Sequence, residues 1–159
     1  MLAAMSEHKA TIRWQQAGGE FAKGRYSREH TWSFDGGLTV AASSSPAAVP
    51  VPLSNPANVD PEEAYVAALS SCHMLTYLYL CYREGIAISS YEDEAVGVLT
   101  KNERGVPWVS TVQLTPRVVY AGTAPSHDDE VRLHHAAHEG CFISNSVKTD
   151  IQIKLGGDT

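Results

Sequence analysis

Two cysteines carry the chemistry that this chain is best equipped to perform. Cys72 lies inside an uncharged stretch, residues 64–82, and Cys141 directly follows a His-rich segment that ends in glycine. A single buried thiol is usually inert packing. A thiol in the middle of a helix, with a second thiol at a helix end, instead indicates thiol–disulfide chemistry. We therefore take Cys72 as the candidate nucleophile and Cys141 as the candidate resolving thiol.

Each cysteine also has a purely structural interpretation, because free cysteine is among the most buried residue types. This is the better interpretation for Cys81, which lies nine residues after Cys72 and so about 900° around a helix, on the opposite side. Apolar burial raises the pKa of a thiol, so a reactive Cys72 requires a cation nearby. The linear spacing leaves open whether Cys72 and Cys141 approach to disulfide distance.

A run of histidines precedes the second cysteine and offers an alternative. His134, His135 and His138 form the pattern H-H-x-x-H, and His134 and His138 share a helical face. A zinc site that uses both with Cys141 is conceivable. The run contains no acidic residue of the H-E-x-x-H kind, and no Cys-x-x-Cys accompanies it. We expect solvated surface histidines, with no metal and no bound cofactor.

The bulk composition is that of an ordinary globular protein. The 159 residues predict a single domain, residues 1–159, with residues 1–8 disordered. A net charge of −6 gives no electrostatic support for a nucleic-acid partner. Three cysteines are too few, and an odd number, for a secreted disulfide framework. The first 14 residues lack a signal-peptide pattern, so the expected location is cytoplasmic.

The uncharged stretch 64–82 has to be compared with a membrane span. Its 19 residues without Lys, Arg, Asp or Glu just reach the length required. However, Ala, Ser, His, Thr and Tyr make it mildly hydrophobic, and aromatic belts with flanking basic loops are missing. A helix that is apolar nearly all round is typical of a helix buried on all sides. We predict a buried helix and no membrane association.

Start and stop signals delimit this helix. Asp60 is a capping residue, Pro61 occupies the first helical position, and Gly85 follows the expected end near Arg83. The helix is then about 24 residues, or roughly 36 Å, long. A small sheet covers one side of such a helix and leaves the other bare. Packing of two such helices in a homodimer is the simple solution.

The remaining segments predict an α+β fold with antiparallel sheets and a long buried central helix. Strands come in hairpins rather than alternating with helices. A second helix begins after Ser126 and ends near His138, before Gly140. The Pro-rich stretch 43–59 is a long loop. The expected β-rich segments are residues 9–16, 25–34, 38–42, 88–101, 107–120 and 151–155.

Two segments together resemble the OsmC/Ohr superfamily, whose members include OsmC-like hydroperoxide reductases. They are NPANVDPEEAYVAALSSCHMLTYL, residues 55–78, and CFISNSVKTDI, residues 141–151. The family pattern is N-P-E-E/Q-x-x-x-A-A-x-x-x-C, followed much later by C-P-x-S-N-A. The motif Tyr-Ser-Arg-Glu-His at 26–30 is also similar to the β-rich start of the family. The resemblance runs along nearly the whole chain and implies an intertwined homodimer with two active sites at the subunit interface.

The resemblance also implies roles for individual residues. Cys72 falls on the peroxidatic cysteine of the family and Cys141 on its resolving cysteine. Glu62 falls on the active-site carboxylate. Arg28 is the better match to the activating arginine, with Arg25 as a competitor because the strand motif is loose.

These roles imply a thiol-dependent peroxidase of the oxidative stress response that reduces organic hydroperoxides. Cys72 attacks the peroxide and becomes a sulfenic acid, Cys141 converts it to a disulfide, and an external dithiol reduces the disulfide. Two departures, Phe142 for the usual proline and His73 for a common aromatic residue, leave the substrate open. The alternative function is a non-enzymatic redox sensor or small-molecule-binding protein on the same fold.

The spacing of two of these residues leads to one geometric hypothesis. Glu62 and Cys72 are ten residues apart, which is about 15 Å on a straight helix. A carboxylate at that distance cannot easily share one arginine with the sulfur. If two such helices pack antiparallel across a dimer axis, Arg28 and Glu62 of one chain complete the site around the partner's Cys72.

Overall fold

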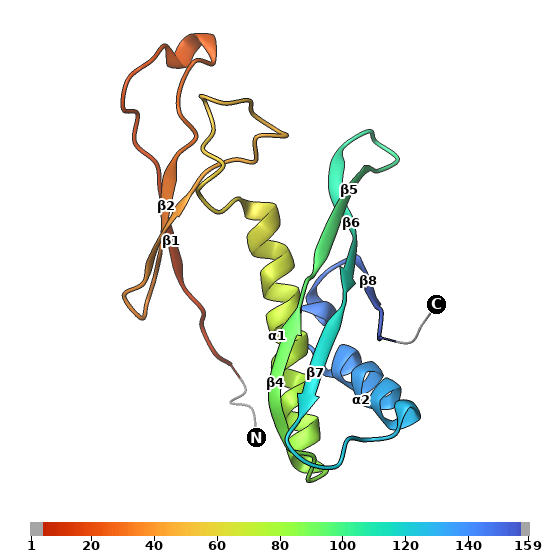
Figure 1. Ribbon diagram of the computed structural model, residues 1–159. Coiled ribbons are helices and arrows are strands. Elements are labelled where there is room, and N and C mark those ends of the chain that lie inside the picture. The colour runs from red at the N-terminus through yellow and green to blue at the C-terminus, as the bar shows by residue number, and fades with distance from the viewer. Residues whose placement is uncertain (1–4, 157–159) are drawn as a thin grey trace. The chain divides into compact units, whose positions relative to one another are not determined.

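The computed structural model describes residues 5–156, and these form two compact units that divide between Ala64 and Tyr65. Figure 1 shows the helices and strands of both units. The expected disorder of residues 1–8 concerns in part residues 1–4, which lie outside the described residues. Residues 5–8 are exposed and belong to no helix or strand.

The first unit contains a three-stranded antiparallel sheet in the order β1-β2-β3. Its strands are β1 (Ala10–Arg13), β2 (His30–Phe34) and β3 (Thr39–Ala42). Residues 35–37, between the expected β-rich segments 25–34 and 38–42, form a turn that joins β2 to β3, and Gly37 closes it with a positive φ of 92° and an N–H bond of 3.0 Å to the Phe34 carbonyl. Glycine adopts this backbone conformation without the steric cost that other residues carry.

The connection between β1 and β2 is longer than the sequence predicted. Residues 14–16 and 26–29 are not strand, and a short 3₁₀ helix, η1 (Phe21–Lys23), lies between them. Three aromatic rings hold this connection together, with Phe21 and Tyr26 centred 4.5 Å apart and Trp14 against both. Packing of these rings on each other therefore replaces continued strand pairing.

The Pro-rich stretch 43–59 is a loop without helix or strand, as predicted. Hydrogen bonds tie both ends of the loop together. The Ser43 N–H donates to the Val59 carbonyl at 3.0 Å, and the Asn55 N–H donates to the Ser43 hydroxyl at 3.0 Å. The Asn58 amide also reaches the Ala42 carbonyl at 3.3 Å. The loop is consequently fixed to the end of β3.

Helix α1 (Pro61–Arg83) begins and ends where the sequence predicted. Asp60 and Glu63 form a reciprocal capping box, in which each side chain accepts the backbone N–H of the other, at 2.8 and 3.1 Å. Gly85, with φ of 74°, terminates the helix and donates its N–H to the Tyr82 carbonyl at 3.1 Å. One face of α1 is buried, and its residues recur every fourth position: Leu69, His73, Tyr77 and Cys81.

Among the described residues, α1 is the one helix long and apolar enough to cross a membrane, with a mean hydropathy of 1.2 over its best window. A core helix of a globular protein passes the same criterion, so a single such helix is weak support for a membrane span. The opposite face of α1 is uncovered in the chain, where Leu75, Tyr79 and Tyr82 are all more than half exposed, at 60%, 54% and 75%.

The second unit contains five strands and helix α2 (His127–Gly140). Strand β4 (Ile88–Asp93) pairs antiparallel with β7 (Pro116–Tyr120). The other sheet has the order β5-β6-β8. Its strands are β5 (Val96–Lys101), β6 (Pro107–Leu114) and β8 (Asp150–Ile153).

The sequence predicted one continuous β segment where the structure has two strands, at 88–101 and again at 107–120. One side chain explains why both break at the same level. The Asp93 carboxylate accepts the Thr115 N–H at 2.6 Å and the Ser70 hydroxyl at 2.5 Å, so a side chain takes the place of a ladder bond. The turn between the expected β-rich segments 88–101 and 107–120 joins β5 to β6 in a hairpin, in line with the prediction that strands come in hairpins.

The antiparallel fold prediction is confirmed for every strand pair except one. β8 pairs with β6 in parallel, with Val112 opposite Ile151. The chain returns to β6 through α2, and such a crossover brings a strand back in the same direction. Alternation of apolar residues in 151–155 carries no information about this direction.

Packing of α1 against the strands and α2 forms two core clusters. One joins Tyr77 and Cys81 of α1 to Leu133 and Ala137 of α2. The other joins Leu69 of α1 to two residues of β6, which are Val112 and Leu114. At Gly97 the strand approaches α1 so closely that a Cβ would lie 2.5 Å from a methyl of Val66. The buried faces of both helices therefore meet inside the second unit.

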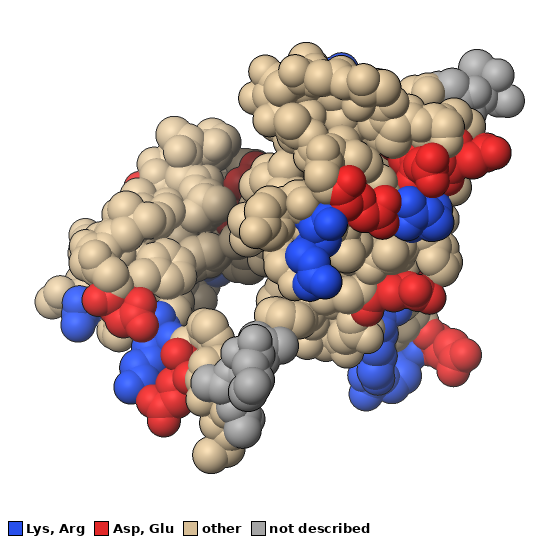
Figure 2. All heavy atoms as spheres, turned by 90° about the horizontal axis from the view of Figure 1, so that it is seen from below, with Lys and Arg blue, Asp and Glu red and all other residues tan. Residues whose placement is uncertain are grey.

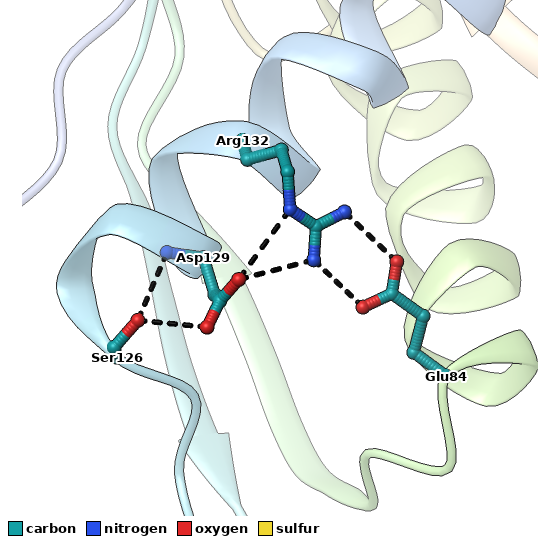
Figure 3. A network of polar contacts seen from close by, with 4 residues as sticks. All are labelled: Glu84, Ser126, Asp129 and Arg132. Atoms are coloured by element: carbon teal, nitrogen blue, oxygen red, sulfur yellow. Dashed lines mark hydrogen bonds and ion pairs between the residues drawn. The ribbon is translucent and has the colours of Figure 1, made fainter.

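A polar network outside the core also joins the two helices. Arg132 of α2 donates two hydrogen bonds to the Glu84 carboxylate beyond the end of α1, at 2.9 and 2.8 Å (Figure 3). Asp129 accepts from the same guanidinium at 3.2 Å, and the Ser126 hydroxyl caps α2 by accepting the Asp129 N–H at 3.2 Å. All of these groups are partly exposed, so we assign them a small and salt-sensitive contribution to stability.

Charged side chains on one face of the molecule are few and well separated (Figure 2). Figure 2 shows one face of the molecule, on which acidic and basic residues stand in small mixed groups and form no continuous basic area. The net charge is −6. This face thus lacks the electrostatic footprint of a nucleic-acid-binding surface.

Candidate active site

The structure brings Cys72 and Cys141 together. Cys72 lies in the middle of α1 and is partly buried, whereas Cys141 follows the last residue of α2 and is fully buried. Both are free thiols, and Cys141 lies close enough to Cys72 to raise the pKa of its thiol as a hydrogen-bonding neighbour. Both belong to the second unit. Two neighbouring thiols are a precondition for disulfide formation.

The close approach depends on a small residue at the end of α2. A Cβ on Gly140 would lie 3.3 Å from the Thr76 methyl, one turn beyond Cys72 on α1. Thr76 itself is oriented by a hydrogen bond of 2.9 Å from its hydroxyl to the Cys72 carbonyl. A Cβ at position 140 would require the Thr76 methyl to move by a few tenths of an ångström, so α2 ends in tight contact with α1.

Surroundings of the first thiol disfavour its ionised form. Burial raises the pKa of Cys72, and the neighbouring Cys141 thiol raises it further. The backbone N–H groups of Ile143 and Phe142 act in the opposite direction, because they point toward the Cys72 sulfur and lower its pKa. The Ser144 N–H donates to the Cys141 sulfur at 3.4 Å. Backbone amides thus surround both sulfurs.

Sequence reasoning missed these amides, because a backbone N–H carries no signal in the residue types. A partial signal existed at Phe142, where the family pattern has proline. Proline has no N–H to donate, so phenylalanine at this position adds a donor near the Cys72 sulfur. The segment is held in place by the Asn145 side chain, which donates to the Cys141 carbonyl at 2.9 Å.

Arg28 lies in the first unit and is held by local acceptors. Its guanidinium donates to the carbonyls of Tyr26 at 2.5 Å and Gly24 at 3.0 Å, and it stacks 3.7 Å from the centre of the Tyr26 ring. Its backbone N–H donates to Leu53 of the Pro-rich loop at 2.8 Å. The competitor Arg25 is ion-paired with Glu20. Arg28 forms no salt bridge within residues 5–156, so its charge remains available for an anion.

Glu62 lies in the first turn of α1, with Cys72 ten residues further along the same helix. It is half-buried and does not take part in the capping box, which uses Glu63. Within the described part of one chain, no ion pair joins Glu62 to Arg28. The hypothesis that a partner chain supplies these two groups stays a prediction.

The prediction of solvated histidines is wrong for His134. This residue is 1% exposed, and its Nδ1 lies 3.0 Å from Nε2 of His73, which is 0% exposed. The helical spacing placed His134 and His138 on one face correctly but could not show that α2 packs this face inward. His135 is exposed, as expected.

Burial keeps both of these imidazoles neutral. It lowers the pKa of His73 to about 4, where the nearby Asp93 carboxylate acts in the opposite direction and His138 adds to the lowering. It lowers the pKa of His134 to about 3, and His73 adds to this shift. The zinc alternative receives no geometric support, since residues 5–156 hold no group of three or more His, Cys, Asp or Glu arranged to bind a metal ion.

Comparisons with known proteins agree with this architecture. The sequence model of a family described as OsmC-like protein matches residues 54–156. The structure of an OsmC-like protein of unknown function from Vibrio cholerae shares 50% sequence identity, covers 96% of this chain and 100% of that chain, and has a TM-score of 0.92. No curated protein matches the chain.

More distant structures share the fold. The organic hydroperoxide resistance protein OhrB of Bacillus subtilis is 22% identical, with 96% of this chain and 100% of that chain covered and a TM-score of 0.67. An organic hydroperoxide resistance protein from Elizabethkingia anophelis is 18% identical, with 97% and 96% covered and a TM-score of 0.71. At these identities the likeness is one of fold.

Proposed function

Because the chain belongs to the OsmC-like family, we propose that it is a thiol-dependent peroxidase that reduces organic hydroperoxides. The observation that carries the proposal is the proximity of the Cys72 thiol in α1 to the Cys141 thiol directly after α2, 69 residues away in sequence. The organic hydroperoxide resistance proteins among the structural neighbours support the same activity.

The reaction has three steps. The Cys72 thiolate gives two electrons to the peroxide, so an S–O bond forms, the O–O bond breaks, and the alkoxide takes up a proton and leaves as alcohol. The Cys141 sulfur then attacks the sulfenic sulfur of Cys72, forming the disulfide and releasing water. An external dithiol reduces the disulfide by two electrons and is itself oxidised.

Formation of the thiolate needs help, because burial raises the pKa of Cys72. The amides of Ile143 and Phe142 supply part of this help from within the second unit. We assign the rest to the Arg28 guanidinium, with Glu62 holding it through a bidentate ion pair. In this proposal both come from the partner chain and meet at Cys72 in a homodimer.

The uncovered face of α1 supports a homodimer. Leu75, Tyr79 and Tyr82 form an exposed apolar stripe on a helix that carries no charge between Glu63 and Arg83. An exposed apolar stripe of this kind is typical of a protein–protein contact. Two copies of α1 packed along this face would cover it.

The surroundings of the thiols favour an organic peroxide. Phe142 and Ile143, which follow Cys141, are 63% and 36% exposed, so apolar groups lie beside the reacting sulfurs. An alkyl or aryl hydroperoxide can pack on such groups, whereas hydrogen peroxide gains nothing from them. In this proposal the protein is cytoplasmic. It works without a cofactor or metal and has no nucleic-acid partner or membrane association.

The second candidate function is a non-enzymatic redox sensor on the same fold. The raised pKa of Cys72 favours a sensor, because a thiol that is mostly protonated reacts slowly with peroxide. Turnover distinguishes the two functions, since a sensor is oxidised once and an enzyme consumes peroxide continuously.

The experiment follows consumption of cumene hydroperoxide in the presence of excess dithiothreitol, with disulfide mapping after oxidation. We expect turnover by the wild-type protein, loss of turnover in Cys72→Ser, and a mapped link between Cys72 and Cys141. Cys81→Ser is the matched control, because Cys81 is buried in the core away from the site. A single stoichiometric oxidation without turnover would favour the sensor and contradict the peroxidase.

A further inference from the structure

Two buried histidines, one on the helix that carries Cys72 and one on the helix that precedes Cys141, have no role in the chemistry proposed above. His73 is the residue after Cys72 on α1, and His134 lies seven residues before Cys141 on α2. Their side chains are 0% and 1% exposed and meet at an N···N distance of 3.0 Å. The pair therefore links the two helices that carry the two cysteines.

The two rings are arranged so that a nitrogen of one can donate a hydrogen bond to a nitrogen of the other. The two imidazole planes differ by 6° and their centres are 5.3 Å apart, which suits two rings in nearly one plane meeting edge to edge. Tyr77 and His134 show the contrasting geometry, with ring centres 3.9 Å apart at 13°, one face over the other. One ring N–H thus points from one histidine to the bare nitrogen of the other, and both imidazoles are neutral.

The outer nitrogen atom of each ring has no hydrogen-bond partner in the described part of the chain. These two atoms, Nδ1 of His73 and Nε2 of His134, are buried. An unpartnered buried polar atom costs about 1–3 kcal/mol, and aliphatic or aromatic side chains would fill the same space without that cost. A pair retained for packing alone would be a poor solution, which points to a role for the inter-helix bond itself.

A second set of contacts fixes the same bridge. Tyr77, one turn after His73, stacks on His134, and its hydroxyl bonds to the Tyr120 hydroxyl at 2.7 Å. Tyr120 in turn donates to the Glu130 carboxylate of α2 at 2.7 Å. Both helices are therefore held in one rotational setting close to the thiols, and rotation of either helix would change the sulfur–sulfur distance.

We propose that the His73–His134 hydrogen bond is a positioning bridge that sets the approach of the Cys141 sulfur to Cys72. This inference rests on the proposed two-cysteine chemistry and concerns its second step. In that step the Cys141 sulfur forms the S–S bond, the Cys72 S–O bond breaks, and the oxygen leaves as water. Attack of Cys72 on the peroxide forms no bond to Cys141, and the bridge acts on this first step only through the amides of Phe142 and Ile143.

The test uses two kinds of variant at each position. His134→Phe and His73→Leu fill the space and remove the bond. His134→Asn and His73→Gln keep a polar atom where the bonding nitrogen lies, because the Asn side-chain amide falls near Nδ1 and the Gln amide near Nε2 of the replaced ring. His135→Gln, on the exposed side of α2, is the matched control. Far-UV circular dichroism confirms that each variant is folded.

The first readout is the fate of the sulfenic acid after addition of one equivalent of cumene hydroperoxide. The sulfenic acid is trapped with dimedone, and the adduct is quantified by mass spectrometry. Wild type and His135→Gln should give the disulfide. His134→Phe and His73→Leu should still consume peroxide, while the ratio of trapped sulfenic acid to disulfide increases about tenfold, since a misplacement of reacting groups by about 1 Å can have an effect of this size or larger. The Asn and Gln variants should restore the disulfide.

The second readout does not involve peroxide. The thiols are oxidised with diamide, and the disulfide is equilibrated with dithiothreitol. A tenfold loss of disulfide stability in the bridge-removing variants corresponds to a midpoint potential about 30 mV higher. If wild-type protein ignores peroxide, the proposed function fails, and this measurement still decides the bridge. Equal potentials and equal trapping in wild type and His134→Phe would overturn the inference, as would an Asn variant as impaired as the Phe variant.

Discussion

Acidification offers a quantitative test of the buried imidazole pair. In the folded protein burial lowers the pKa of His73 to about 4 and that of His134 to about 3, from the ordinary histidine value of 6.5. Near pH 5 both rings are therefore neutral in the folded state and protonated in the unfolded state. Because the unfolded state binds more protons, stability falls as the pH drops below 6.5 and is fully present above it.

The loss of unfolding free energy follows from the difference between the pH and the pKa of the unfolded histidines. A pH of 5 lies about 1.5 units below the pKa of an unfolded histidine, which corresponds to about 2 kcal/mol per residue at 1.36 kcal/mol per unit. The pair together should lower the free energy of unfolding by about 4 kcal/mol between pH 7.5 and pH 5. The groups facing His73, Asp93 from β4 and His138 from α2, act on it in opposite directions.

The measurement is urea unfolding at pH 7.5 and pH 5 at one protein concentration. We expect about half of the wild-type decrease to disappear in His134→Asn, which cannot take up the proton, and His135→Gln to retain all of it. The carboxylates with lowered pKa values, such as Glu29 and Glu84, titrate below this interval. A wild-type protein equally stable at both pH values would show that the two rings are not buried as neutral groups.

Three further substitutions have defined outcomes. Phe142→Pro removes one backbone donor near the Cys72 sulfur and should raise the pKa of that thiol, measured by iodoacetamide alkylation against pH, whereas Phe142→Leu should not. Gly97→Ala places a Cβ against Val66 and should lower the free energy of unfolding by about 1–3 kcal/mol in urea titration; an unchanged midpoint would show that α1 moves freely there. Asp60→Ala removes the capping oxygen of α1 and should cost about 1 kcal/mol in thermal unfolding, with Asp60→Asn close to wild type.

Local features of the sequence predicted the elements well. The capping residue Asp60, Pro61 and Gly85 delimited α1, and Ser126 marked the start of α2. Each of these signals acts within a few residues, because a cap or a positive φ is satisfied by its own backbone neighbours. Both cysteines were chosen from their local surroundings as well.

Predictions that depended on distant partners were less complete. The break in two β segments depends on the Asp93 carboxylate, which bonds across to Thr115, 22 residues later. The parallel direction of β8 depends on the crossover through α2. In both cases a pattern of apolar residues predicts a strand but contains nothing about the strand or side chain beside it.

The sequence by itself determined the family, the α+β class, the central helix and the two thiols, because these are recorded in residue types and short-range spacing. Tertiary structure alone decided that Cys72 and Cys141 lie close together, that backbone amides of residues 142 and 143 face a sulfur, and that His73 and His134 bond in the interior. The physical reason is that each of these contacts joins segments some 60 to 70 residues apart. Packing of α1 on α2 creates these contacts, and neither helix encodes its partner.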